Sequence, residues 1–554
     1  MGRRIVALFR FPTGQRTPAK TTLSRAAWLI PVAGGVVSSG LMLCAGQRNN
    51  SRLLLALFAF WVLSPFVALV LASAVSTRWS ALTRATLHAL TLLITAGSLA
   101  IYGNALSMPP GSKLAFPFLV VPLGTWLLII VTVPLASLLT RRLSRLRSVR
   151  WLIKTVAAVA MLSVVGIMGL LGILLFDRNR DTALPAPTGP FTVGRATCVW
   201  NEAPADPLLP QSGSRRELLA WIWYPAAAEQ PTGAVDEYLP APWRNAIESQ
   251  SGLLLAQFLT RDLSRVHAHS LHDADVSPQQ LSYPVVLMRT GGAALTTDYT
   301  TLAEDLASHG YIVVGFDAPF RTRVVVLPDG SVIARAPQNN LDLVSGAQAD
   351  QLASQLAEAW AADTAFALDQ IERLNASDPS GRFLGRLDMQ RVGIFGHSLG
   401  GATALLFCHH DSRCKAGVDV DGAPLGSVVT EGVRQPFMFL LSDHGGETPG
   451  AEAPRAIRDA GANIRAIYDR LPGDRRVQIT IRGAGHFMFS DGVMLKSPFL
   501  MRALRTLGVV RLDGRRQVAI TAHCMRTFFD VSLKDAPAST LKSLSEYPEV
   551  EVVP

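Results

Sequence analysis

The sequence predicts an α/β domain with a mostly parallel sheet covered by helices, preceded by an all-α membrane domain of about five transmembrane helices. Three observations lead to this prediction. The first 176 residues combine long apolar runs with no Asp or Glu. Later residues alternate between strand-like and helix-like patterns. A serine between two glycines stands at one strand-to-helix junction. We place the membrane domain at 1–176, a linker at 177–190 and the α/β domain at 191–554.

Five apolar runs in the first part predict the membrane domain. Each is near the roughly 20 residues that a helix needs to cross a bilayer. A secretory signal peptide would instead be one shorter run with a cleavage site. The runs lie at about 26–46, 53–75, 85–105, 117–140 and 153–176.

Charge is divided unevenly between the two parts. Residues 1–176 hold 17 Lys and Arg, whereas the rest of the chain holds 35 against 42 Asp and Glu. The basic residues lie between apolar runs rather than along one folded face, which argues against a nucleic-acid partner. They gather before the first run, at Arg78 and Arg84, and at 141–150. The positive-inside rule then predicts an integral protein of a bacterial inner membrane or a plasma membrane, with a cytoplasmic N-terminus and a periplasmic or extracellular α/β domain.

Four cysteines in the outer part are compatible with an oxidising compartment, where an even number of thiols can pair. Cys408 and Cys414 are close enough in sequence to form a bridge, which would leave Cys198 with Cys524. Four unpaired thiols are the alternative.

Buried strands and helices are expected along the second part. Residues 253–269 and 347–374 have helical patterns, and apolar residues in the second of these recur on one face. The residues after about 505 read as a final helix and a polar tail. The expected strands lie at 215–226, 283–292, 311–319, 391–395, 416–420, 436–441 and 477–481.

The stretch "VGIFGHSLGGATALLF" (392–407) places Ser398 between an apolar strand and a helix-prone segment. A serine on such a tight turn is held above the carboxyl end of a sheet with its oxygen exposed, and Gly396 and Gly400 permit the turn. Ligands of parallel-sheet proteins bind at this edge. We therefore predict Ser398 to be a nucleophile.

A serine hydroxyl needs a base, and in this arrangement the order along the chain is serine, acid, histidine. His486 follows a late strand and a Gly-Ala-Gly turn, so it is the expected base. The alternative bases are His409, His410, His444 and His523.

Two aspartates compete for the acid. Asp421 ends the strand after the nucleophile, and Asp443 ends the following strand. Asp419 lies inside the first of these strands, where a carboxyl is expected to be buried rather than poised at a site. Spacing does not choose between Asp421 and Asp443.

Two backbone donors are needed to stabilise the developing oxyanion. The Leu399 N–H follows the nucleophile and is one donor by position. The other is expected in the glycine turn after the 285–288 strand, at Gly292, with Gly291 and Ala293 as alternatives.

Residues about 190–490 resemble the platelet-activating-factor acetylhydrolase and dienelactone-hydrolase-like branch of the α/β-hydrolase superfamily. The resemblance rests on "WYPA" (223–226), "YPVVLMRTGG" (283–292), "LAEDLASHGYIVVGFDAP" (302–319), "GHSLGG" (396–401), "DVDGAPLG" (419–426) and "GAGHF" (483–487). It implies the α/β-hydrolase fold, Asp421 as the acid, no metal requirement, and short or oxidised acyl esters as substrates. The chain departs from the family at "MRTGG", where Arg289 and Thr290 replace a polar Ser-His pair before a glycine.

These observations predict a membrane-anchored serine carboxylic-ester hydrolase that acts outside the cytoplasm on short-chain acyl esters or (phospho)lipid-like esters. The expected catalytic residues are Ser398, Asp421 and His486, with Leu399 and Gly292 at the oxyanion hole, and no cofactor or metal is expected. Acyl transfer on the same fold and a catalytically decayed sensor or scaffold are the alternatives. Transport by the helical part lacks support because no acidic residue occurs in its crossings.

Overall fold

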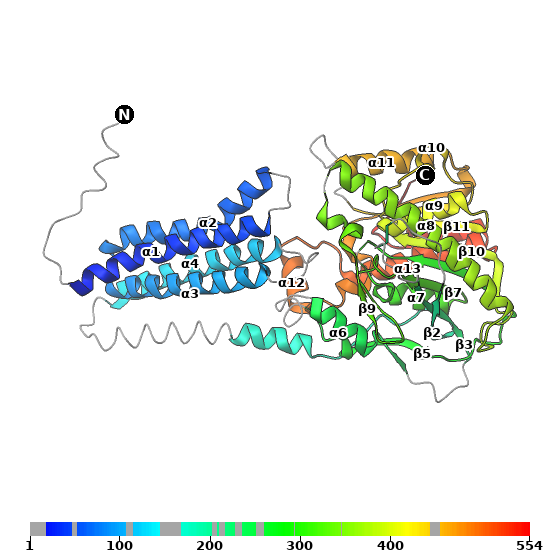
Figure 1. The fold of residues 1–554 in the computed structure, drawn as a ribbon, viewed down its shortest axis with the longest axis horizontal. Helices are drawn as coiled ribbons and strands as arrows, with labels where there is room; N and C mark the ends of the chain where they lie inside the picture. The colour runs from blue at the N-terminus through cyan, green and yellow to red at the C-terminus, as the bar shows by residue number, and fades with distance from the viewer. Residues whose placement is uncertain are drawn as a thin grey trace. The chain divides into compact units, whose positions relative to one another are not determined.

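The computed structural model separates the chain into two compact units, Met1–Gly169 and Leu170–Pro554 (Figure 1). Each unit is described by itself below. The described residues are 18–46, 52–106, 115–143, 168–201, 208–209, 217–227, 235–250, 260–292, 294–344, 346–443 and 455–553.

Four long helices form the described part of the first unit, and they coincide with the first four predicted apolar runs. Each contains an apolar window of 18 or 21 residues, long enough to cross a membrane. The fifth predicted crossing, 153–176, lies mostly outside the described residues. Its described part, from residue 168 onward, belongs to a helix that continues to residue 178. The four helices are α1 (Pro18–Ala45), α2 (Arg52–Val75), α3 (Ala81–Leu106) and α4 (Ala115–Leu143).

Apolar side chains point outward from this bundle, while small residues lie between its helices. Leu29 is 66% exposed and Phe60 is 74% exposed. By contrast, a Cβ on Gly34 would lie 2.7 Å from Thr95 Cγ2, so α1 and α3 approach closely there. Helix association through small residues with an apolar outer surface is typical of proteins whose solvent is lipid.

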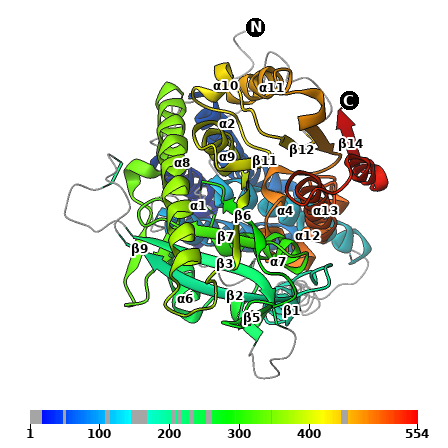
Figure 2. The same cartoon turned by 90° about the vertical axis from the view of Figure 1, so that its right-hand side faces the viewer.

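A sheet of twelve strands, counted over the described residues, forms the centre of the second unit (Figure 2). The strand order is β1-β5-β2-β3-β7-β6-β10-β11-β12-β13-β14, and β4 pairs with β5. The strands are β1 (Thr182–Ala183), β2 (Thr192–Trp200), β3 (Leu218–Ala226), β4 (Val235–Glu237), β5 (Val266–His272), β6 (Tyr283–Arg289), β7 (Ile312–Asp317), β10 (Leu387–His397), β11 (Cys414–Val420), β12 (Phe437–Ser442), β13 (Arg476–Ile481) and β14 (Val550–Val553). A separate hairpin joins β8 (Val324–Val326) to β9 (Val332–Ala334).

The six central strands from β7 to β13 run parallel, as the alternation of strands and helices predicts. Antiparallel pairs occur toward the edges, where β3 pairs with β2 and β7, and β13 pairs with β14. The carboxyl ends of parallel strands meet at one edge of the sheet. The loops that follow β6, β10, β11, β12 and β13 therefore gather there.

Helices cover both faces of the sheet and bury a separate core on each. In β6, Val286 and Met288 face one core, and Val285 and Leu287 face the other, because successive strand residues alternate sides. Helices α7 (Thr300–Ser308) and α13 (Gly514–Leu533) contribute to the first core, and α8 (Ala347–Ala376), α9 (Leu399–His410) and α11 (Arg455–Tyr468) contribute to the second. The remaining described α-helices of this unit with assigned bounds are α6 (Ala241–Gln250), α10 (Val428–Glu431) and α12 (Pro498–Thr506).

The helix expected at 253–269 is wrong over its described part. Residues 266–272 form β5, with Val266, Ala268 and Ser270 buried in alternation. That period of two identifies a strand with one buried face. Residues 253–259 lie outside the described residues.

The segment 177–190, expected to be a linker, packs on the second unit. Its strand β1 pairs with β5. The N–H and hydroxyl of Thr188 both donate to Asp305 Oδ1, at 3.0 and 2.7 Å. Asp177 Oδ2 accepts a hydrogen bond of 2.8 Å from Ser497 Oγ. The Pro-rich segment is thus fixed by its partners rather than free.

The polar tail expected at the C-terminus forms structure as well. After α13, the chain adds β14 at the edge of the sheet, with Val552 opposite Ile479. A four-residue edge strand carries little periodicity of its own, so pairing with β13 defines it.

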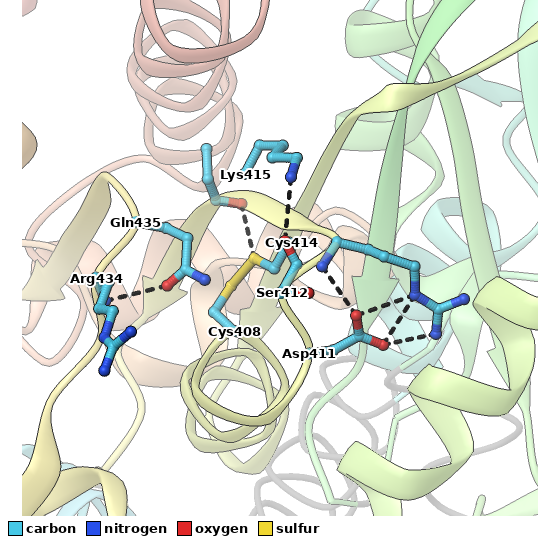
Figure 3. Close-up of a disulfide and its surroundings, with 9 residues drawn as sticks. Cys408, Asp411, Ser412, Cys414, Lys415, Arg434 and Gln435 are labelled. Carbon is cyan, nitrogen blue, oxygen red and sulfur yellow. Dashed lines mark hydrogen bonds and ion pairs between the residues drawn. A yellow bond between two sulfur atoms is a disulfide. The ribbon is translucent and has the colours of Figure 1, made fainter.

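A disulfide joins Cys408 at the end of α9 to Cys414 at the start of β11 (Figure 3). Both residues are 1% exposed. The other pairing considered from the sequence does not form, because Cys198 and Cys524 are free thiols. The bridge closes the short turn between α9 and β11, next to the ion pair that Arg413 makes with Asp411.

Replacing both bridged cysteines with alanine should lower the free energy of unfolding of the second unit by about 2 kcal/mol, because a crosslink over so short a loop removes a modest amount of unfolded-state entropy. Urea denaturation of the full chain in detergent, followed by tryptophan fluorescence, measures the change. Reductant should destabilise the wild type and the control Cys198→Ala equally and leave Cys408→Ala/Cys414→Ala unchanged. A reductant effect on the double variant would contradict this account.

Candidate active site

Ser398 stands on a strained turn between β10 and α9. Its backbone lies at φ 57° and ψ −121°, a conformation that L residues rarely adopt. The Ser398 N–H donates to the Val420 carbonyl at 2.9 Å, which ties the turn to the end of β11. The side chain is half-buried, so its oxygen remains accessible at the carboxyl edge of the sheet.

Three glycines make this turn possible by removing Cβ atoms from crowded positions. A Cβ on Gly396 would lie 1.9 Å from the Gly400 carbonyl oxygen, and one on Gly400 would lie 2.4 Å from the Arg289 carbonyl oxygen. A Cβ on Gly401 would lie 1.8 Å from Asp419 Oδ1. The glycines of "GHSLGG" are therefore required by the close approach of β6, β10, α9 and β11.

The structure brings Ser398, His486 and Asp421 into one hydrogen-bonded row. His486 Nε2 lies 3.1 Å from Ser398 Oγ, and His486 Nδ1 lies 2.6 Å from Asp421 Oδ2. An ionised carboxylate only accepts, so Nδ1 carries the ring proton and Nε2 is free to accept the serine proton. His486 is in the short helix η9 (His486–Met488), directly after the turn that follows β13.

The Asp421 carboxylate is held by a residue that the sequence analysis did not single out. The Ser442 N–H donates to Asp421 Oδ1 at 2.8 Å, and Ser442 Oγ donates to Oδ2 at 2.7 Å. Asp421 itself has φ 56°, immediately after β11. Because Ser442 ends the neighbouring strand β12, the sheet itself fixes the orientation of the carboxylate toward His486.

Asp443, the competing acid, contacts the turn before His486 rather than its ring. Asp443 Oδ2 accepts from the Gly483 N–H at 2.8 Å, and the Asp443 N–H donates to the Ala484 carbonyl at 3.2 Å.

Three of the alternative histidines form hydrogen bonds with residues other than Ser398. His409 bonds to the Gly432 carbonyl, His410 to Glu358 and His523 to the Ser543 carbonyl. His444 lies outside the described residues.

The two N–H groups expected at the oxyanion hole lie in the loop after β6 and at the start of α9. No described atom accepts a hydrogen bond from the N–H of Gly292 or of Leu399. The Gly291 N–H, by contrast, donates to Tyr299 Oη at 3.3 Å. The Gly292 carbonyl accepts from Arg335 Nη1 at 3.1 Å, which anchors the loop to the end of the β8–β9 hairpin. Ala293 lies outside the described residues.

Arg289, which departs from the family pattern, points into the core rather than toward the nucleophile. Its guanidinium lies over the rings of Phe316 and Trp360, at 3.9 and 4.7 Å from their centroids. Nη1 donates to the Phe316 carbonyl at 3.0 Å. Burial lowers the pKa of Arg289 to about 9. Aromatic packing thus accommodates Arg289, one of the two residues that stand in place of the family's polar pair.

Asp419 is fully buried in β11 beneath the turn, as expected from its place inside a strand. Its Oδ1 accepts from the Gly422 N–H at 2.8 Å, next to the catalytic candidate Asp421. Burial, together with the nearby Asp421 charge, raises the pKa of the Asp419 carboxyl to about 8. In the described part of the chain, no group of three or more His, Cys, Asp or Glu side chains is arranged to hold a metal ion.

Asp419→Asn should become more stabilising as the pH rises. An unfolded Asp ionises near pH 4, whereas the buried Asp419 keeps its proton until about pH 8. The wild type therefore loses stability across this window, and a neutral amide does not. Between pH 5 and pH 8, the unfolding free energy of Asp419→Asn should therefore rise relative to that of the wild type by on the order of a few kcal/mol.

Urea denaturation at both pH values measures this shift. The exposed Asp350→Asn serves as the matched control and should show no such change. A difference between Asp419→Asn and wild type that is independent of pH would contradict a protonated Asp419.

The chain is similar to known ester hydrolases. Residues 372–537 match the family described as platelet-activating factor acetylhydrolase, isoform II. That range contains Ser398, Asp421 and His486. The chain is 25% identical over 226 residues to a platelet-activating factor acetylhydrolase of Canis lupus familiaris, and 27% identical over 226 residues to that of Bos taurus. Each match covers 38% of this chain and 48% of the relative, so the chain spans about half the length of these proteins.

Two further similarities extend the comparison. A probable 1-alkyl-2-acetylglycerophosphocholine esterase of Arthroderma benhamiae is 25% identical over 275 residues, covering 46% of this chain and 64% of that protein. The structure of a ferulic acid esterase from Streptomyces cinnamoneus aligns with a TM-score of 0.54 at 24% identity, over 68% of this chain and all of the other. The fold of the second unit is thus that of an α/β hydrolase, and its sequence is similar to ester hydrolases of the platelet-activating-factor acetylhydrolase-like branch.

Proposed function

We propose that the chain is a membrane-anchored serine ester hydrolase that acts outside the cytoplasm. The observation that carries this proposal is the row Ser398–His486–Asp421, with distances of 3.1 and 2.6 Å between its polar atoms. A nucleophile, a base and an orienting acid at these distances fit acyl transfer from an ester to serine.

Acylation begins when Ser398 Oγ attacks the ester carbonyl and His486 Nε2 takes the serine proton. Asp421 keeps Nδ1 protonated and stabilises the imidazolium that forms. The N–H groups of Leu399 and Gly292 donate to the carbonyl oxygen as it becomes negative, and each such donor is worth about 3–4 kcal/mol. His486 then gives the proton to the departing alcohol.

Deacylation repeats these steps with water in place of the alcohol. His486 accepts a proton from water, the resulting hydroxide attacks the acyl-serine carbonyl, and the proton returns to Ser398 Oγ as the acid leaves. The same two N–H groups stabilise the second oxyanion. An acceptor other than water would instead give acyl transfer, and product analysis separates the two reactions.

The proposed substrates are short-chain acyl esters or (phospho)lipid-like esters. One relative is named a platelet-activating factor acetylhydrolase, and another a probable 1-alkyl-2-acetylglycerophosphocholine esterase. Phe487, next to His486, is 76% exposed and offers an apolar contact beside the site. The four apolar helices would hold the hydrolase domain close to lipid substrates and raise their effective concentration.

The proposed location is a bacterial inner membrane or a plasma membrane, with the hydrolase domain in the periplasm or the extracellular medium. The distribution of arginine between the apolar runs supports a cytoplasmic N-terminus. The Cys408–Cys414 bridge supports an oxidising compartment for the second unit.

Ser398→Ala should abolish covalent labelling by a fluorophosphonate probe, because the probe reacts with an activated serine oxygen. The full chain in detergent is incubated with the probe and examined by gel fluorescence, then assayed with short acyl esters. The half-buried Ser354 lies on α8, and Ser354→Ala should label like the wild type. Absence of labelling of a folded wild type would overturn the proposal and favour a sensor or scaffold.

Asp421→Asn should lower kcat by roughly 10³–10⁴-fold, because an amide no longer stabilises the His486 imidazolium. Asp443→Asn is the matched control: its amide oxygen still accepts from the Gly483 N–H, so kcat should fall by less than about tenfold. Steady-state kinetics on one soluble ester measures both variants. A larger loss in Asp443→Asn than in Asp421→Asn would assign the acid to Asp443.

A further inference from the structure

His397 is a buried histidine beside the nucleophile that takes no part in the Ser398–His486–Asp421 row. It is 6% exposed, and its ring centroid lies 4.8 Å from that of His486. Its Nδ1 lies 2.7 Å from Tyr299 Oη, and its Nε2 lies 2.9 Å from the His486 carbonyl oxygen. Both ring nitrogens are therefore used.

The partners determine which ring nitrogen carries the proton. The His486 carbonyl only accepts, so His397 Nε2–H is the donor and Nδ1 is the acceptor. Tyr299 Oη then donates to Nδ1 while it accepts from the Gly291 N–H at 3.3 Å. Burial raises the pKa of Tyr299 well above its usual value and lowers that of His397 to about 4, so both groups stay neutral near pH 7. A directed chain of hydrogen bonds results.

This chain connects the two loops that must be aligned for the reaction. Gly291 lies in the oxyanion loop next to Gly292, and a Cβ on Gly291 would lie 3.2 Å from His397 Nδ1. At the other end, the bond reaches the backbone of His486 itself. A shift of that backbone changes the 3.1 Å distance between His486 Nε2 and Ser398 Oγ.

Side-chain contacts also secure the residues before His486. Asp443 holds Gly483, as described above, and Gln517 bonds both the N–H and the carbonyl of Gly485, at 3.2 and 3.1 Å. The described side-chain bond to the backbone of His486 comes from His397. His397 thus fixes the backbone of His486, after Asp443 and Gln517 have fixed Gly483 and Gly485.

We propose that His397 is a positioning residue: its Nε2–H holds the His486 backbone, and its Nδ1, through Tyr299, links that backbone to the oxyanion loop. The effect on catalysis rests on the proposed function, whereas the effect on the loop does not. Because His397 contacts no reacting atom, its loss should lower kcat and leave KM nearly unchanged.

Two amide substitutions separate the two halves of the chain. In His397→Gln, the amide nitrogen reaches the place of Nε2 and can still donate to the His486 carbonyl. In His397→Asn, the shorter amide reaches only the place of Nδ1 and can still bond Tyr299. Tyr299→Phe removes the link to Gly291 but leaves His397 in place.

The test compares full-length wild type, His397→Gln, His397→Asn and Tyr299→Phe in detergent. We expect kcat to fall by 10–100-fold in His397→Asn and by less than about threefold in His397→Gln, with KM within about twofold in both. Tyr299→Phe should lie between them. Equal kcat values in the two amide variants would overturn the proposal, because a residue that merely fills space does not distinguish them.

Hydrogen exchange provides a readout that does not depend on activity. Amides of a peptide covering 483–489 should exchange at least tenfold faster in His397→Asn than in His397→Gln, at equal exchange of a reference peptide in α8. Equal exchange of the 483–489 peptide would overturn the positioning role even in a chain that hydrolyses no ester. If the two variants show the expected difference in exchange but the wild type hydrolyses no ester, only the proposed function is overturned.

Discussion

The close approach of backbones around Ser398 is the constraint on which the rest of the site depends. Four elements meet there at distances that exclude a Cβ from Gly396, Gly400 and Gly401. The turn at Ser398 can form only because the glycines have no side chains, which leaves room for the backbone atoms of neighbouring elements. The Val420 carbonyl that receives the Ser398 N–H then sets where β11 ends, and so where Asp421 begins. Ser398 and Asp421 are in this way positioned by the same contact.

The sequence was sufficient for the features that depend on strong local patterns. The buried strands from 283 to 481 and the long helix α8 have continuous apolar runs or a repeating apolar face, and both signals survive without knowledge of partners. The glycine pattern around Ser398 and the turn before His486 likewise identified two residues that the fold brings together. At these positions the local sequence alone is enough to predict the structure.

The acid, the edge strands and the supporting residues depend on partners far away in the sequence. Asp421 and Asp443 follow adjacent strands and both contact the segment 483–486, so only the direction of each carboxylate separates them. Strands β1 and β14 are short and acquire their identity from pairing. His397 was visible in the motif, but its partners Tyr299 and the His486 carbonyl lie 98 and 89 residues away.

The packed segment after the last described apolar helix has a mechanical consequence. Asp177 lies near the end of the helical stretch 168–178. Its Oδ2 accepts hydrogen bonds from Ser497 Oγ and from the Phe499 N–H, at 2.8 and 2.9 Å. Both partners lie within thirteen residues of His486 along the chain. The end of the helical stretch is therefore fixed to the segment that follows His486, so a change in the direction of residues 170–178 is transmitted to that segment.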